Sequence, residues 1–315
     1  MKRPMIFPGQ ASQFVGMGAD LYESVPAARE KIEAAEARLG FELKRLCFEG
    51  PIEELTETRY AQPSILLMSC LTFDWLSKKG VEATVTAGHS LGEYSALVAA
   101  GVLSFEDALD LVALRGRLMF KSGVKTPGTM AAVMGLAREP VENCCAEASQ
   151  GEVVQLANLN SPEQMVISGA VPAVERAMKA CEEAGAKKVV RLNVSGAFHS
   201  ELMGSAATEL GEKLSATHFA EAKVPVVPNV TAEATRDGGN LRGLLIQQLT
   251  KPVLWTDSMA TLRAVDDSPI MEVGPGKVLM GLMRRIDRGA KVNPVGTLAS
   301  LEAWTSAEEG KEAGA

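Results

Sequence analysis

The chain has 315 residues, a mass of 33.4 kDa and a formal net charge of −7 at pH 7. Apolar residues make up 46% of it and charged residues 23%, which is typical of a folded globular protein and excludes a disordered one. The length predicts one large domain or two unequal ones. The acidic balance argues against nucleic acid as a partner, and no apolar run is long enough to predict a membrane helix.

The N-terminal segment and the cysteines bear on the cellular compartment. Pro8 and Gly9 interrupt the first apolar stretch well short of a signal-peptide core. The five cysteines form an odd set without C-x-x-C spacing, which indicates neither a disulfide framework nor a zinc site. We therefore expect a cytoplasmic protein without a metal site, and we expect it to be a monomer.

Strands and helices alternate along the first 125 residues. We predict strands over residues 4–9 and 83–90. We predict helices over residues 25–39, 63–79, 93–101 and 104–120, the last opened by a capping box at Ser104 and Asp107. This alternation is typical of a mostly parallel α/β sheet.

The middle of the chain follows a different pattern, β-α-β-β-α-β, which is typical of a ferredoxin-like fold. Its predicted strands cover residues 129–135, 153–160, 164–169 and 187–194, and its helices cover 138–149 and 171–185. We therefore predict a small domain of residues 126–194, inserted into a large α/β domain of residues 1–125 and 195–315.

After the insert, the large domain resumes with further helices and strands. Helices are predicted over residues 199–214, 241–249 and 276–286, and strands over 224–230 and 269–274.

The most specific local motif is Gly88-His89-Ser90-Leu91-Gly92, a G-x-S-x-G between a predicted strand and a predicted helix. This arrangement is typical of the nucleophile elbow of α/β-hydrolase-like folds, in which a tight turn exposes a serine at the edge of the sheet. The N–H group of Leu91, directly after the serine, is then a candidate oxyanion donor. A second donor could come from Gln10, in the glycine loop that ends the first strand.

A serine nucleophile needs a base, which is most often histidine. His199, directly after the insert, is the favoured base among the three histidines. His89 adjoins the serine and is better interpreted as a packing residue, and His218 lies near a surface connection. The order Ser, acid, His of a standard esterase is absent, because nearly a hundred residues follow the last histidine.

Seven separated segments together resemble the malonyl-CoA:acyl carrier protein transacylases of bacterial fatty acid synthesis, from about Met5 to Ile286. The segments are FPGQASQ, GPIEELTETRYAQPS, AGHSLGEYSALVAAG, ALRGRLM, AFHSELM, QQLTKPVLW and EVGPGKVL. The resemblance implies a large α/β domain with an inserted ferredoxin-like domain. It also implies malonyl transfer from malonyl-CoA to acyl carrier protein without a metal or redox cofactor.

The resemblance also implies roles for the matching residues. Ser90 would be the acylated nucleophile and His199 its base, oriented by the main-chain carbonyl of Gln248. Gln10 and Leu91 would supply the oxyanion N–H groups.

Substrate recognition in this family implies two further residues. Arg115 would pair with the free carboxylate of the malonyl group, and Gln62 would line the same pocket. Ala11 departs from the family pattern GQGSQ, and we expect its effect on the oxyanion loop to be small.

Two alternative functions share the same serine and histidine: an acyltransferase that serves a polyketide synthase, and a serine thioesterase or esterase. A third alternative is a non-catalytic scaffold. An acidic carrier protein would need a basic surface, and the sequence offers two clusters. One comprises Lys187, Lys188 and Arg191, and the other comprises Arg284, Arg285, Arg288 and Lys291. We prefer the first cluster because it leads along the chain to His199.

Overall fold

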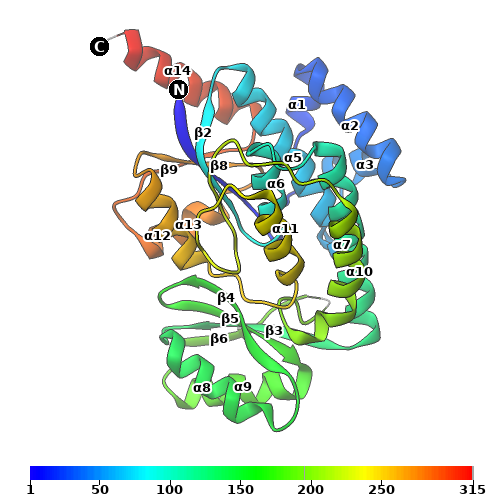
Figure 1. The fold of residues 1–315 in the computed structure, drawn as a ribbon, viewed down its shortest axis with the longest axis vertical. Coiled ribbons are helices and arrows are strands. Elements are labelled where there is room, and N and C mark those ends of the chain that lie inside the picture. Colours follow the sequence, from blue (N-terminus) through cyan, green and yellow to red (C-terminus); the bar gives the residue numbers. More distant parts are fainter. Residues whose placement is uncertain (195, 314–315) are drawn as a thin grey trace.

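The computed structural model describes residues 1–194 and 196–313, which form two β-sheets (Figure 1). Ser195, where the predicted large domain resumes, and residues 314–315 lie outside the described residues. The larger sheet is parallel, with the strand order β7-β2-β1-β8-β9. Its strands are Lys2–Phe7 (β1), Glu82–Gly88 (β2), Val226–Val227 (β7), Ile270–Val273 (β8) and Val292–Val295 (β9). The predicted parallel α/β sheet is confirmed.

Helices cover both faces of the parallel sheet. The helices of this larger part are Ala19–Ser24 (α1), Pro26–Leu39 (α2), Leu43–Phe48 (α3), Ile52–Thr56 (α4), Thr58–Lys78 (α5), Gly92–Ala99 (α6), Phe105–Lys125 (α7), the short 3-10 helix Glu201–Met203 (η1), Gly204–Ala216 (α10), Gly238–Gln247 (α11), Trp255–Val265 (α12), Val278–Ile286 (α13) and Leu298–Ala313 (α14). In β1, Met5 and Phe7 belong to the core shared with α5, α6 and α7, whereas Ile6 belongs to the core shared with α12 and α13. A strand buried on both faces explains the continuous apolar run of the sequence.

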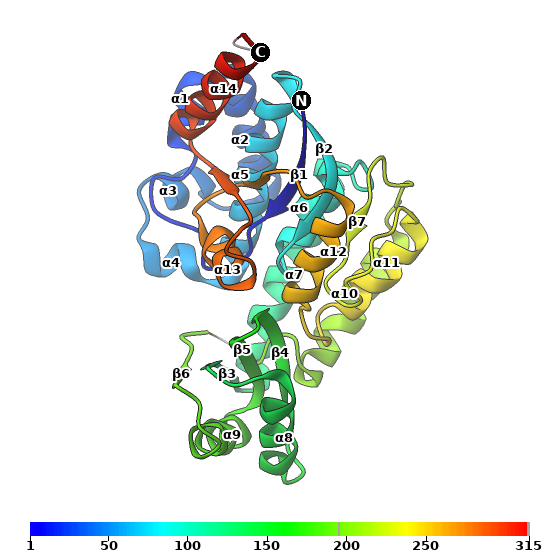
Figure 2. The ribbon, with the colours of Figure 1, turned by 90° about the vertical axis from the view of Figure 1, so that its left-hand side faces the viewer.

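The smaller sheet is antiparallel and forms a separate lobe with two helices packed against it (Figure 2). Its strands are Gly128–Met134 (β3), Val154–Ser161 (β4), Gln164–Ala170 (β5) and Lys188–Arg191 (β6), and its helices are Arg138–Ser149 (α8) and Val171–Glu183 (α9). The order β4-β5-β3-β6 is that of a ferredoxin-like sheet, so the predicted pattern is confirmed. The exact boundaries of the insert, 126–194, stay a prediction.

The topology brings the ends of β1 and β2 together. These neighbouring parallel strands pair Phe7 with Gly88, and the N–H of His89 donates to the carbonyl of Phe7 at 3.0 Å. Because the carboxyl ends of parallel strands share one edge, the Gly9-Gln10 loop lies beside the turn at Ser90.

Several boundaries differ from the sequence expectation. α5 begins at Thr58, five residues before the predicted start, so Pro63 lies in its second turn. Because proline has no N–H, the helix lacks the hydrogen bond from residue 63 to the carbonyl of Arg59. α7 continues past Phe120 to Lys125. No helix begins at His199, whose φ of 55° is left-handed; a 3-10 turn at residues 201–203 and then α10 follow it. The helices α1, α3, α4, α12 and α14 and the strand β9 were not anticipated.

Among residues 1–194 and 196–313, every helix is too short or too polar to span a bilayer.

We predict that Gly92→Ala destabilises the fold at the turn between β2 and α6. A Cβ at residue 92 would lie 2.1 Å from the carbonyl oxygen of Phe7, a backbone atom that cannot swing aside. The free energy of unfolding, measured by urea denaturation, should fall by about 1–3 kcal/mol or more. The matched control is Gly243→Ala in α11, where a Cβ meets nothing within 4 Å. This control should leave stability unchanged or raise it, by up to ~1 kcal/mol. Equal stabilities of the two variants would contradict the prediction.

Candidate active site

Ser90 lies in a strained turn that presents its side chain to a cavity. Its φ is 52°, in the left-handed region that non-glycine residues rarely adopt. The turn is tight, because a Cβ at Gly88 would lie 1.9 Å from the backbone of Gly92. The predicted nucleophile elbow therefore has the expected geometry, a strand followed by a sharp turn and a helix.

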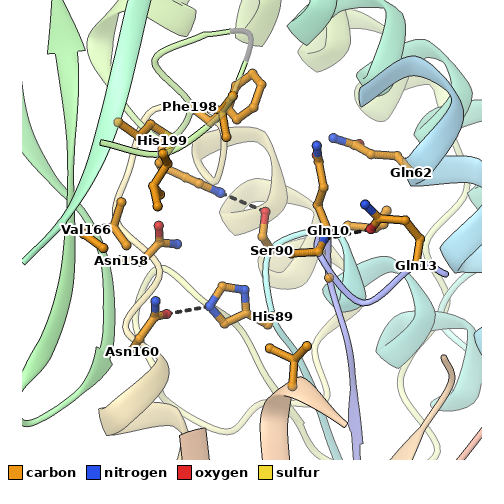
Figure 3. Close-up of a pocket in the computed structure, with 18 of the residues that line it drawn as sticks. Gln10, Gln13, Gln62, His89, Ser90, Asn158, Asn160, Val166, Phe198 and His199 are labelled. Carbon is orange, nitrogen blue, oxygen red and sulfur yellow. Dashed lines mark hydrogen bonds between the residues drawn. The ribbon is translucent and has the colours of Figure 1, made fainter. Parts of the chain in front are cut away.

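His199 bridges the serine and a backbone carbonyl. Its Nε2 lies 2.8 Å from Ser90 Oγ (Figure 3). Its Nδ1 lies 2.8 Å from the carbonyl oxygen of Gln248. A carbonyl only accepts hydrogen bonds, so Nδ1 carries the proton and Nε2 can accept the proton of the serine hydroxyl. The carbonyl of Gln248 thus occupies the place that a carboxylate takes in a catalytic triad.

The imidazole of His199 is kept neutral by its surroundings. Burial, followed by the positive charge of Arg115, lowers its pKa to about 3, and the hydrogen bond to Gln248 opposes this shift only in part. The unfolded chain takes up this proton near pH 6.5, whereas the folded protein does so only near pH 3. His199 therefore costs stability as the pH falls through this window, and at neutral pH it is ready to act as a base.

Arg115 lies fully buried in α7 with its guanidinium beside the serine. Its Nη2 donates to Ser90 Oγ at 3.1 Å and to Gln248 Oε1 at 3.0 Å, and its Nη1 donates to Gln62 Oε1 at 2.7 Å. A guanidinium that is held by neutral amides and faces a cavity is suited to an anionic group. Arg117 is exposed and lines a different surface groove.

The cavity around Ser90 has a volume of about 310 Å³ and lies between the two sheets. Six of the seven predicted site residues line this one cavity: Gln10, Gln62, Ser90, Leu91, Arg115 and His199. The seventh, Gln248, does not line the cavity but forms hydrogen bonds with Arg115 and His199. Apolar walls are formed by Met119, Met130, Val166, Phe198 and Leu279.

The loop after β1 lies on the other side of the serine from His199 (Figure 3). The side chain of Gln10 donates to the carbonyl of Thr56 at 3.4 Å and to Thr58 Oγ1 at 3.3 Å. Ala11 has a φ of 81°, and its N–H donates to Gln13 Oε1 at 2.8 Å. The alanine therefore occupies a conformation in which the glycine of the family pattern is unstrained.

The other two histidines occupy the places that the sequence suggested. His89 Nε2 lies 2.7 Å from Asn160 Oδ1, away from the serine hydroxyl, and its ring packs edge-on against Trp255 at 5.2 Å. Burial lowers the pKa of His89. His218 is exposed and is not part of the cavity.

Sequence reasoning missed a polar network beneath the elbow. Asn229 Oδ1 accepts from the N–H of Ser90 at 2.7 Å, and its Nδ2 donates to the carbonyl of Gly88 at 2.6 Å. Glu93 accepts hydrogen bonds from both Asn229 and Gln248. The one available signal was an acidic residue in an otherwise apolar helix; nothing in the sequence pointed to Asn229.

Within the part of the chain that the structure describes, no group of three or more His, Cys, Asp or Glu side chains is arranged to hold a metal ion. The five cysteines are unpaired and buried.

Comparison with known proteins agrees with this geometry. The family model described as "Acyl transferase domain" matches residues 5–302. A malonyl CoA-acyl carrier protein transacylase of Bacillus subtilis (strain 168) is 44% identical over 302 residues, covering 96% of this chain and 95% of the relative.

Two solved structures of malonyl transferases are similar to this chain in both fold and sequence. An acyl carrier protein S-malonyltransferase from Vibrio cholerae superimposes with a TM-score of 0.91 at 43% identity, covering 96% of this chain and 99% of its own. A malonyl-transacylase solved in complex with a type II PKS acyl-carrier protein gives a TM-score of 0.93 at 39% identity, covering 97% and 99%. The chain belongs to the malonyl CoA-acyl carrier protein transacylase family of acyl transferase domains.

Proposed function

We propose that this chain transfers the malonyl group from malonyl-CoA to the phosphopantetheine thiol of acyl carrier protein, supplying fatty acid elongation. The observation that carries the proposal is the convergence of His199 Nε2 and Arg115 Nη2 on Ser90 Oγ, at 2.8 and 3.1 Å. One atom is thus in contact with a base that can activate it and with a cation that can hold an acyl carboxylate.

The first half-reaction loads the enzyme. His199 Nε2 takes the hydroxyl proton as Ser90 Oγ attacks the thioester carbon of malonyl-CoA. The backbone N–H groups of Gln10 and Leu91 stabilise the oxyanion that forms. The C–S bond breaks, the coenzyme A sulfur takes the proton from His199, and a malonyl-serine ester remains.

The second half-reaction transfers the malonyl group from Ser90 to the carrier. The phosphopantetheine thiol of the carrier gives its proton to His199 and attacks the ester carbon. Ser90 Oγ leaves and recovers that proton, so the enzyme is regenerated. Each step exchanges an acyl group between sulfur and oxygen without a change of oxidation state, so the chemistry requires no metal or redox cofactor.

Arg115 accounts for the choice of acyl group. A malonyl carboxylate satisfies its guanidinium within the cavity, whereas an acetyl group leaves that charge buried without an anionic partner. Gln62 supports this role by accepting from Nη1 at 2.7 Å. We also propose a cytoplasmic location, which is supported by the five unpaired cysteines in a protein of this metabolic family.

The carrier protein needs a surface near the cavity mouth. The structure brings Lys187, which pairs with Glu163 at 3.2 Å, together with Arg284, Arg285 and Arg288 around one hollow, the cationic pocket. Lys187 belongs to the first cluster of the sequence analysis and the three arginines belong to the second, whereas Lys188, Arg191 and Lys291 do not line this pocket. Gln164 lines both the cationic pocket and the cavity at Ser90, so the two hollows adjoin at this residue. We propose that the acidic carrier docks on the cationic pocket.

Two alternative functions make different predictions. A serine thioesterase would pass the acyl group to water, whereas a transferase holds it until a thiol arrives. A polyketide carrier in place of a fatty acid carrier leaves the chemistry unchanged, and one of the similar structures is a complex with such a carrier. Relative kcat/KM values for the two carriers separate these functions.

We predict that Ser90→Ala abolishes the malonyl adduct, because the attacking oxygen is lost. Intact-protein mass spectrometry after mixing with malonyl-CoA measures it. The matched control, Ser95→Ala, removes a buried serine hydroxyl from α6, the helix that follows the turn at Ser90, and should load fully. A full adduct on folded Ser90→Ala would contradict the assignment. In buffer, the wild-type adduct should persist for minutes; rapid decay to free enzyme would instead indicate a thioesterase.

We predict that Arg115→Ala loses malonyl transfer and gains relative activity with acetyl-CoA. Loss of a charged hydrogen-bonding partner should slow malonyl loading by about 10–100-fold or more. Arg117→Ala, two residues along the same helix but exposed, should retain wild-type selectivity. Acylation rates with both donors measure this effect, and an unchanged malonyl preference in Arg115→Ala would show that the carboxylate is read elsewhere.

We predict that charge reversal in the cationic pocket, by Lys187→Glu or Arg284→Glu, raises the KM for the carrier and leaves malonyl-CoA loading unaltered. The reason is that an acidic partner would meet a negative charge in the pocket. Lys179→Glu on α9, outside that pocket, is the control. A KM that is unaffected by both reversals would place the carrier on another surface.

A further inference from the structure

Glu93 is a buried carboxylate that the proposed mechanism does not use. It follows the elbow in α6, and its Oε2 accepts from Gln248 Nε2 at 2.8 Å and from the backbone N–H of Asn229 at 3.0 Å. All three residues have no exposed surface. A buried carboxylate is costly to maintain, so this position calls for a physical reason.

The hydrogen bond to Glu93 is the shortest of the contacts that hold the Gln248 amide in one orientation. An ionised carboxylate only accepts hydrogen bonds, so it must face the NH₂ end of that amide. The same Nε2 also donates to the carbonyl of Ser90 at 2.9 Å. With both of its amide hydrogens used in this way, Gln248 is obliged to turn its Oε1 in the opposite direction.

The Oε1 atom of Gln248 therefore faces Arg115. Gln248 Oε1 accepts from Arg115 Nη2 at 3.0 Å, and the same Nη2 lies 3.1 Å from Ser90 Oγ. If the amide turned over, its NH₂ group would face the guanidinium donors and repel them. The guanidinium would then lose the contact that holds it beside the nucleophile.

We propose that Glu93 is a positioning residue for malonyl selectivity, which acts by fixing the Gln248 amide so that Arg115 is aimed at the acyl group on Ser90. This inference rests on the proposed function. It concerns the side chain of Gln248 only, because the carbonyl that orients His199 belongs to the backbone at the end of α11 and is set by the helix.

The electrostatics fit this role. Burial raises the pKa of Glu93 to about 7, while the hydrogen bonds from Gln248 and Asn229 and the charge of Arg115 pull it down. The carboxylate and the guanidinium are thus linked through one amide, in a place where neither contacts solvent. Kinetic assays at pH 8 keep Glu93 mainly in its ionised, accepting form.

A merely structural role predicts different behaviour. Glu93 also accepts a hydrogen bond from the N–H of Asn229, whose side chain accepts from the N–H of Ser90. In a merely structural role, loss of Glu93 would weaken the turn at Ser90 without affecting selectivity. The ratio of malonyl to acetyl loading separates the two roles. A weakened elbow slows both donors alike, whereas a misdirected Arg115 slows the malonyl donor alone.

The test compares loading rates of Ser90 with malonyl-CoA and acetyl-CoA at pH 8 by rapid quench and intact-protein mass spectrometry. Glu93→Leu removes the acceptor, and Glu93→Gln keeps an acceptor oxygen in the same shape. Thr86→Val is the matched structural control, because it removes a buried hydrogen bond to α6 without touching Gln248. Thermal unfolding establishes that each variant is folded.

We expect Glu93→Leu to lower the malonyl rate by about 10–100-fold, the value of a hydrogen bond to a charged group, with the acetyl rate unchanged. Glu93→Gln and Thr86→Val should retain the wild-type ratio. A folded Glu93→Leu with an unchanged ratio would overturn the inference, as would equal slowing of both donors.

Two further outcomes are also informative. If Glu93→Leu does not fold, Glu93→Asp takes its place, because the shorter side chain withdraws the carboxylate from Gln248. It should lower the ratio as well, and an unchanged ratio would overturn the inference. Failure of the proposed function has a different signature, since the wild-type enzyme would then acquire no malonyl group.

Discussion

The site depends on the backbone turn that places Ser90 at the end of β2. A φ of 52° at the serine, between two glycines whose Cβ positions are filled by backbone, leaves the side chain one direction to take. Asn229 satisfies the N–H and C=O groups that the turn exposes. The serine hydroxyl is consequently fixed before any substrate arrives, and the base and the guanidinium can converge on it.

A neutral backbone carbonyl, that of Gln248, contacts His199 where a carboxylate stands in many serine hydrolases. Burial, followed by the charge of Arg115, lowers the pKa of His199 to about 3, and the hydrogen bond to this carbonyl offsets the shift only in part. Among the described residues, Arg115 is the buried cation beside the serine, and the amides of Gln62 and Gln248 hold its guanidinium. Its proposed role as the partner of the substrate's carboxylate would connect the chemistry of the serine with the choice of acyl group.

Much of this architecture could be predicted from the sequence, because its signals are local. Strand-helix alternation indicated the parallel sheet, the β-α-β-β-α-β order indicated the insert, and G-x-S-x-G indicated the elbow at Ser90. The side-chain network of Glu93, Asn229 and Gln248 could not be predicted, since it joins residues up to 155 positions apart through tertiary contacts. Two predicted helix starts were wrong. The helix predicted from Pro63 begins at Thr58, and the helix predicted from His199 begins only at Gly204, because the backbone of His199 is left-handed.

We propose that Arg115 binds the acyl carboxylate beside the nucleophile itself, and a crystal structure of the malonylated enzyme would reveal this contact. We expect an ester on Ser90 Oγ with its free carboxylate within hydrogen-bonding distance of the Arg115 guanidinium, and with the ester carbonyl oxygen facing the N–H groups of Gln10 and Leu91. A carboxylate directed toward the cavity mouth, with Arg115 still bound only to Gln62 and Gln248, would show that the acyl group is recognised elsewhere.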